Sequence, residues 1–241
     1  MAQGSSTGAA PGPALAALIF DVDGTLAETE ELHRQAYNET FAAAGLGWHW
    51  SRDDYHWLHR TTGGKERMRH YRDSRGDNAP SVAEIAAIYA RKTLRYGDLV
   101  AGGGLTLRPG VRELVAAARA AGLRLGVATT TGNPNVDALC LACWGQPAAE
   151  IFDAVVAGDD VPNKKPAPDA YLRVLELLGV PAEAAIAFED SRNGLVSALG
   201  AGLRVVVTPS IYTGGEDFTG AACVLPDLTA EALPGSLGLP L

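Results

Sequence analysis

The chain has 241 residues and is 47% hydrophobic, which suits one large domain, or a core domain with a smaller one, but not a repeat array. Its net charge of −8 leaves no surplus of basic residues for a phosphate backbone, which argues against general binding to nucleic acid or to an anionic membrane surface. No apolar run reaches about 18 residues, so we expect no membrane span.

Residues 1–13 are mostly small and lack the charged and apolar parts of a secretion signal, so we expect a disordered tail. Three cysteines offer no disulfide framework and favour a reducing compartment. Cys140 and Cys143 form a C-x-x-C pair within an expected helix, where packing is favoured over zinc or redox chemistry. We expect a cytoplasmic location, with a chloroplast stroma after transit-peptide removal as the alternative.

Five short apolar runs separated by helical patterns predict parallel strands buried on both faces. They cover residues 14–20, 123–128, 152–157, 184–188 and 203–208. Helices begin after Pro109-Gly110 and at Pro168-Asp169, with apolar residues at helical spacing. The fold class is therefore α/β: a Rossmann-like parallel sheet of five core strands with helices on both faces.

The spacing between the first two strands is too long for a simple crossover, which needs only about a dozen residues. We therefore predict an inserted helical cap at residues 28–104, with hinges near 27–29 and 102–104. The catalytic core would comprise residues 14–27 and 105–241. The insert contains a first helix ending at Gly45, an aromatic-rich stretch at 48–57, a glycine pair at 63–64 and a helix over 83–94.

Two aspartates, Asp21 and Asp23, follow the first strand directly, and Asp190 follows the fourth. Because the carboxyl ends of parallel strands meet at one edge, these three residues should converge there. Burial and mutual repulsion disfavour such carboxylates unless a cation is present. Three oxygens in this position suit an octahedral Mg²⁺, which would orient a phosphate while one aspartate attacks phosphorus.

Other parts of a phosphoryl-transfer site are present. Thr129 ends the second strand, and its hydroxyl and the following backbone amides can bind phosphate oxygens. Lys165 supplies an ammonium group to the same phosphate, with the adjacent Lys164 as the less favoured candidate. Gly24 permits a close backbone approach beside the aspartates.

Four segments resemble, in order, the four motifs of the haloacid dehalogenase superfamily: D-V-D-G-T, V-A-T-T-T, K-K-P-A-P-D and F-E-D-S-R-N-G. The resemblance covers nearly all of the chain after the tail. It implies that Asp21 is the nucleophile that becomes an aspartyl phosphate. It also implies that Asp23 is the acid/base, with its backbone carbonyl on the metal, and that Asp190 is the third protein ligand.

The same resemblance assigns the remaining core residues. Thr129 would bind the phosphate, Lys165 would be the lysine of the third motif, and Glu189 would be either a metal ligand or a carboxylate beside one. We also expect substrate contacts from Thr130, Thr131 and Asn193, which lie within the second and fourth motifs.

The insert resembles the C1 cap of the superfamily. Three segments, A-E-T-E-E-L-H-R, T-T-G-G-K-E-R-M and K-K-P-A-P-D-A-Y, resemble those of CbbY-type sugar-phosphate phosphatases. The substrate that this implies is xylulose 1,5-bisphosphate, an inhibitor of Rubisco, so the implied role is metabolite repair. Residues 52–95 hold ten basic and six acidic side chains, as a clamp for a second phosphate requires. The candidates for substrate binding in the cap are Glu30, His33, Gly64, Lys65, Glu66 and Arg67.

Structural alternatives remain for several of these residues. Glu30 and His33 lie in a first helical turn, where acidic residues are favoured by the helix dipole. The tryptophans Trp48, Trp50 and Trp57 are expected in the cap core rather than against substrate. For Asp159 and Asp160, at the end of the third strand, a solvated loop is the expectation.

Three functions are open at this point. The favoured one is a two-step hydrolysis of a small sugar bisphosphate by a monomer, with no nucleic-acid or membrane partner. The first alternative is a mutase like the related β-phosphoglucomutases, which share the cap and the motifs. The second is a non-catalytic binding protein, against which the complete set of five motif side chains argues: Asp21, Asp23, Thr129, Lys165 and Asp190.

Overall fold

The computed structural model describes residues 14–240, and the expected tail at 1–13 lies outside them. Its centre is a parallel sheet of six strands in the order β3-β2-β1-β4-β5-β6. The strands are β1 (Ala17–Phe20), β2 (Arg124–Ala128), β3 (Ala154–Val156), β4 (Ala185–Glu189), β5 (Arg204–Val207) and β6 (Cys223–Val224). The five predicted core strands are confirmed. The sheet also has a sixth strand, whose two residues are too few to give a pattern.

Alternate residues of β1 enter different cores, as a strand covered on both faces requires. Leu18 and Phe20 belong to the apolar cluster on one face, where the Phe20 ring stacks on Phe188 with centroids 4.8 Å apart. Ala17 and Ile19 belong to the cluster on the other face. The predicted fold class is therefore confirmed: an α/β Rossmann-like sheet between helices.

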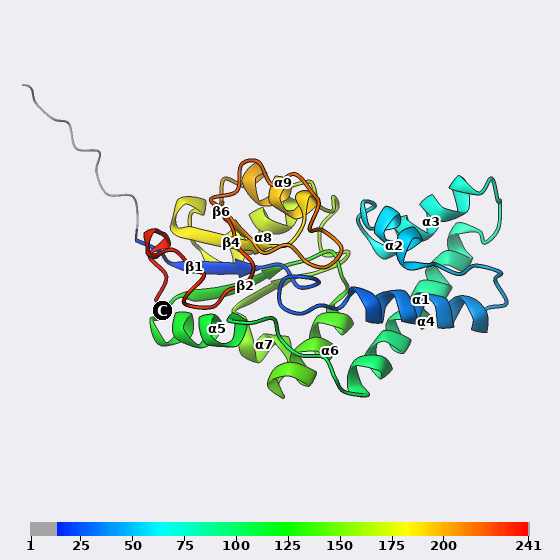
Figure 1. The fold of residues 1–241 in the computed structure, drawn as a ribbon, viewed down its shortest axis with the longest axis horizontal. Coiled ribbons are helices and arrows are strands. Elements are labelled where there is room, and N and C mark those ends of the chain that lie inside the picture. The colour runs from blue at the N-terminus through cyan, green and yellow to red at the C-terminus, as the bar shows by residue number, and fades with distance from the viewer. Residues whose placement is uncertain (1–13, 241) are drawn as a thin grey trace, which may run out of the picture.

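Helices cover both faces of the sheet (Figure 1). On one side lie α5 (Val111–Ala120), α6 (Asn133–Trp144) and α7 (Ala148–Ile151), and on the other α8 (Asp169–Leu178) and α9 (Arg192–Gly200). The two predicted helix starts agree with α5 and α8. Short 3₁₀ turns lie at Ala182–Ala184 and Gly235–Leu237.

Four further helices form the cap, which projects from one end of the sheet (Figure 1). They are α1 (Glu30–Ala43), α2 (Arg52–His59), α3 (Gly64–Ser74) and α4 (Val82–Ala101). Each of α2 and α4 begins with a capping box, in which a serine and the acidic residue three positions later satisfy each other's backbone N–H groups. The bounds of a cap domain at 28 and 104, and the hinges there, remain our proposal.

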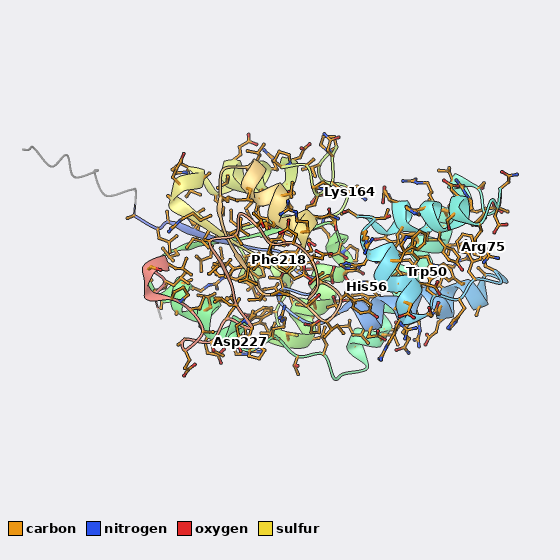
Figure 2. All side chains as sticks on the ribbon, turned by 45° about the horizontal axis from the view of Figure 1, so that its top comes forward. Trp50, His56, Arg75, Lys164, Phe218 and Asp227 are labelled. Atoms are coloured by element: carbon orange, nitrogen blue, oxygen red, sulfur yellow. The ribbon has the colours of Figure 1, made fainter. Side chains whose placement is uncertain are left out.

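The cap has its own aromatic core. Trp50 is fully buried and packs edge-on against Phe41, with ring centroids 4.8 Å apart, and Trp48 is also buried. Figure 2 shows Trp50 among the cap helices. Trp57 differs from our expectation, because 39% of its surface is exposed and its ring lies edge-on to His70 instead. Among the helices described, none is both long and apolar enough to cross a bilayer.

Candidate active site

The motif residues lie at one edge of the sheet, where the parallel strands end. Asp21 follows β1, Thr129 follows β2, Glu189 ends β4 and Asp190 follows it, while Lys165 lies in the loop before α8. One pocket between the sheet edge and the cap is lined by most of these side chains. The expected convergence is therefore found in the structure.

Lys165 brings a positive charge to this edge of the sheet. Its Nζ atom lies 2.7 Å from Oδ1 of Asp21 and 2.6 Å from Oε1 of Glu189. Tyr171 also donates to that Glu189 oxygen, at 2.5 Å. Burial alone would lower the pKa of Lys165, but the two carboxylates outweigh burial and hold the pKa above its usual value. The lysine is thus charged at neutral pH.

Asp21, Glu189 and Asp190 form a buried acidic cluster, whose candidate ligand atoms all lie within 4.8 Å of one another. The second oxygen of Glu189, Oε2, is buried without a hydrogen-bond partner. Burial raises the pKa of Asp21 to about 8, even though Lys165 opposes this, and burial and Asp21 raise the pKa of Asp190. One lysine does not balance three carboxylates, so a hard divalent cation such as Mg²⁺ fits this cluster.

Two glycines lack the Cβ atoms that would otherwise collide with the carboxylates of the cluster. A Cβ atom on Gly194 would lie 1.9 Å from the unpartnered oxygen of Glu189, and one on Gly24 would lie 2.3 Å from Oδ2 of Asp190. Gly24 also has a φ of +83°, which side-chain-bearing residues rarely adopt. These two glycines therefore allow the carboxylates to approach one another.

The Asp23 carboxylate turns away from this cluster and toward the cap. It accepts hydrogen bonds from Thr29, at 2.5 Å, and from Nε2 of His33, at 3.0 Å. Burial would raise the pKa of Asp23, but His33 outweighs it, so the pKa is lowered. The Asp23 side chain is therefore not one of the three that form the acidic cluster.

The cap supplies a second group of polar side chains to the pocket. Glu30 accepts from the Tyr55 hydroxyl at 2.6 Å and lies 2.8 Å from Nε2 of His59. Arg67 donates to the same Tyr55 hydroxyl at 2.7 Å. Burial would raise the pKa of Glu30, but His59 and then Arg67 hold it well below its usual value. Glu30, His33, Gly64 and Arg67 thus line the same pocket.

Two of the predicted cap residues, Lys65 and Glu66, are not among the residues that line the pocket. Lys65 points to the sheet unit, by which we mean the sheet and the helices that cover it. Its Nζ atom lies 2.6 Å from Asp159 of that unit. Lys164 bridges Asp159, at 3.1 Å, and Glu66, at 3.3 Å. Asp159 is therefore part of an ion-pair network between the cap and the sheet unit, and not only a solvated loop residue as expected. Figure 2 shows Lys164 beside this junction.

The remaining predicted substrate residues border the pocket from the sheet side. Thr130, Thr131 and Asn193 all line it. The Asn193 amide donates to the Thr62 hydroxyl at 3.1 Å and so joins α9 to the cap.

Comparison with known proteins identifies the chain. Residues 15–202 match the family model of haloacid dehalogenase-like hydrolases. The chain belongs to the haloacid dehalogenase-like hydrolase family. Protein CbbY of Rhodobacter capsulatus is 58% identical over 226 residues, which are 94% of this chain and 99% of that protein. The family and this relative identify a phosphatase, so a binding protein without activity is no longer a candidate.

Solved structures of this hydrolase family agree with the sequence match. CbbY from Rhodobacter sphaeroides, solved in complex with phosphate, is 53% identical, covers 94% of this chain and all of its own, and has a TM-score of 0.88. A mutant of the same protein was solved in complex with xylulose 1,5-bisphosphate, with the same identity, coverage and TM-score. A β-phosphoglucomutase from Clostridium difficile, at 19% identity and a TM-score of 0.75, shares the fold.

Lys92 of this hydrolase lies beside the site, although the sequence indicated only that it is one of the basic residues of the cap. Lys92 of α4 is 2% exposed, and its Nζ donates to Nδ1 of His33 at 2.6 Å. Nε2 of His33 can then donate to Asp23, so a line of hydrogen bonds runs from Lys92 to the expected acid/base. Lys92 lies where the apolar stripe of α4 would place an apolar residue, four positions after Ile88 and four before Tyr96.

Lys92→Met is predicted to stabilise the fold most at low pH. Burial lowers the pKa of Lys92 from 10.5 to about 7. The unfolded chain therefore binds the Lys92 proton more tightly than the folded chain does. The cost of burying the charged ammonium is complete below pH 7 and decreases as the pH rises toward 10.5. We expect the gain in unfolding free energy to be about 3 kcal/mol larger at pH 6 than at pH 9. Urea unfolding at both pH values measures it, and an equal gain at both would contradict this burial effect.

Proposed function

We propose that this phosphatase is Mg²⁺-dependent and hydrolyses xylulose 1,5-bisphosphate through an aspartyl phosphate. The observation that carries the proposal is a single pocket that joins the acidic cluster and Lys165 to the half-buried Arg67 of the cap. The CbbY relative solved with xylulose 1,5-bisphosphate supports the choice of substrate. We also propose that the protein acts as a cytoplasmic monomer.

The proposed chemistry has two steps. An oxygen of Asp21 attacks phosphorus, and the bond from phosphorus to the sugar oxygen breaks as Asp23 gives a proton to that oxygen. His33 lowers the pKa of Asp23 in the empty pocket, so the negative charge of the bound phosphate would have to raise this pKa before Asp23 can act as the acid. Asp23 then takes a proton from water, whose oxygen displaces Asp21 and releases phosphate. Mg²⁺ held by Asp21, Asp190 and the Asp23 carbonyl, with Glu189 on or beside it, would neutralise charge on the transferred group.

The transferred phosphate would lie among donors of the sheet unit. The Lys165 ammonium already bonds Asp21, and Thr129 and the backbone amides after it border the same pocket. These groups fit the oxygens of a phosphate, which accept hydrogen bonds from ammonium, hydroxyl and amide groups.

The second phosphate would bind in the cap. Arg67 faces the pocket from the first turns of α3, next to Gly64. A Cβ atom at Gly64 would lie 2.2 Å from the Tyr89 ring and 2.4 Å from the Tyr37 hydroxyl, so only glycine fits this wall. Backbone N–H groups and the positive end of the helix dipole at this turn favour an anion. We propose Glu30 and His33 as contacts for the sugar between the two phosphates.

Arg67→Met is predicted to reduce the preference for a bisphosphate. The side chain keeps its apolar length but loses the guanidinium, so kcat/KM for xylulose 1,5-bisphosphate should fall about 100-fold. The rate with acetyl phosphate, which has no second phosphate, should change by less than about threefold. Arg69→Met, on the same helix but outside the pocket lining, is the matched control. A preserved bisphosphate preference in Arg67→Met would contradict the clamp.

Lys65→Met tests the other proposed part of the clamp. Its ammonium lies on Asp159 at the rim, so it can reach a second phosphate only by leaving that carboxylate. A loss confined to bisphosphates would place Lys65 on the substrate. An equal loss for acetyl phosphate would leave it as a contact between the cap and the sheet unit.

Product analysis separates the phosphatase from a mutase. Incubation with glucose 1-phosphate and Mg²⁺ should give little glucose 6-phosphate, whereas xylulose 1,5-bisphosphate should release inorganic phosphate. Rapid conversion of glucose 1-phosphate to glucose 6-phosphate without phosphate release would overturn the proposal.

A further inference from the structure

One residue of the sheet unit is built into the core of the cap. Tyr212 lies in the loop between β5 and β6, yet it is 6% exposed and belongs to the aromatic cluster of the cap. Among the described residues, it is the one buried member of that cluster that does not come from the cap itself. Its ring therefore crosses the junction at which the pocket lies.

Tyr212 contacts the side chains that hold the cap part of the pocket. Its ring is edge-on to Tyr55, with centroids 5.5 Å apart, and roughly parallel to His59 at 6.1 Å. Its hydroxyl donates to Glu31. Tyr55 and His59 are the two partners of Glu30, and the Tyr55 hydroxyl also accepts from Arg67. Movement of Tyr212 would thus displace the supports of Glu30 and Arg67.

The loop that carries Tyr212 is tied to the other half of the site. Thr213 donates to the backbone carbonyl of Asp190 at 2.7 Å and accepts from the backbone N–H of Ser210 at 2.8 Å. Arg108 donates to the carbonyls of Thr208, at 2.7 Å, and Pro209, at 2.9 Å. These bonds on both sides of Tyr212 hold it in register with the acidic cluster.

We propose that Tyr212 is a positioning residue, which sets Tyr55 and His59, and through them Glu30 and Arg67, at the correct place relative to the acidic cluster. It touches neither phosphate. Tyr212 affects only the binding of the part of the substrate that reaches the cap. The inference therefore rests on the proposed sugar-phosphate phosphatase function. A substrate that does not reach the cap does not need this alignment.

The test compares Tyr212→Ala with Tyr71→Ala. Tyr71 packs edge-on to Trp48 and Trp50 in the same aromatic cluster, with ring centroids 5.2 and 5.5 Å apart, and it does not pack on the Tyr55 ring. Both variants lose a tyrosine of the cap cluster, and thermal unfolding measures that shared structural cost. Kinetics with xylulose 1,5-bisphosphate and with acetyl phosphate then report the alignment separately.

We expect Tyr212→Ala to lose about 10- to 100-fold in kcat/KM for the bisphosphate, with KM raised, and to keep its rate with acetyl phosphate. Tyr212→Phe, which retains the ring and loses only the bond to Glu31, should recover most of the loss. Tyr71→Ala should keep the wild-type ratio between the two substrates. The inference is overturned if Tyr212→Ala loses both substrates equally, or loses no more of the ratio than Tyr71→Ala.

Failure of the proposed function gives a different result. In that case the wild-type protein itself releases no phosphate from xylulose 1,5-bisphosphate. The same comparison is then made with the phosphosugar that the wild type hydrolyses best, and the Tyr212 inference stands or falls on that ratio.

Discussion

Asp21→Asn is expected to lower kcat/KM for every phosphate ester at least about 10⁴-fold. Asp21 lies at the end of β1 with one oxygen 2.7 Å from the Lys165 ammonium, and it is one of the three carboxylates of the acidic cluster. An amide in the same place has the same shape but cannot act as the nucleophile, and it also removes a negative charge from the acidic cluster.

The covalent step can be observed directly. Wild-type protein quenched in acid during turnover of labelled substrate should carry phosphate on one aspartate, and Asp21→Asn should carry none. Asp98→Asn, an exposed aspartate on α4, is the control for loss of a charge and should behave as the wild type. Turnover of Asp21→Asn within about tenfold of the wild type would rule out Asp21 as the nucleophile.

Removal of Mg²⁺ is expected to have the second largest effect. Dialysis against a chelator should reduce turnover at least about 1000-fold, and added Mg²⁺ should restore it. The physical reason is the buried cluster of three carboxylates, in which Glu189 has an oxygen without a partner. Without a cation, burial raises the pKa of Asp21 to about 8, so at neutral pH this side chain would be largely a carboxylic acid and not the carboxylate that the proposed attack requires.

Stability supplies a readout that does not depend on turnover. A cation that binds only the folded protein raises the unfolding temperature as its concentration rises. Mg²⁺ should therefore stabilise the wild type and have little effect on Asp190→Asn, which keeps the shape of the site but lacks one charge. Unchanged turnover after chelation, with no stabilisation by added Mg²⁺, would show that the cluster holds no catalytic metal.

The sheet and the residues at its edge could be predicted because both follow from short-range patterns. Apolar runs give the strands, and parallel strands bring their carboxyl ends together, so Asp21, Glu189 and Asp190 meet whatever the detail of the loops. The helix α2 was not predicted within the aromatic stretch. Its signal, a serine with an aspartate three residues later, is present at Ser51 and Asp54.

The walls of the cap pocket could not be predicted in the same way. Lys92 meets His33 across 59 positions, and Tyr212 meets Glu31 across 181. The first contact depends on how α1 and α4 pack within the cap, and the second on how the cap faces the sheet, and no local pattern encodes either arrangement. The interrupted apolar stripe of α4 could have marked Lys92 as a buried cation. Nothing near Tyr212 in the sequence indicates that it belongs to the core of the cap.

The most direct test of the account is the ratio of kcat/KM for xylulose 1,5-bisphosphate and ribulose 1,5-bisphosphate, measured as Mg²⁺-dependent phosphate release. Both substrates carry two phosphates, so the clamp alone does not distinguish them and the ratio reports how the pocket reads the sugar. We predict a ratio of about 100 or more in favour of xylulose 1,5-bisphosphate, which corresponds to about 3 kcal/mol. A ratio near one, or no release from either compound, would contradict the proposed substrate.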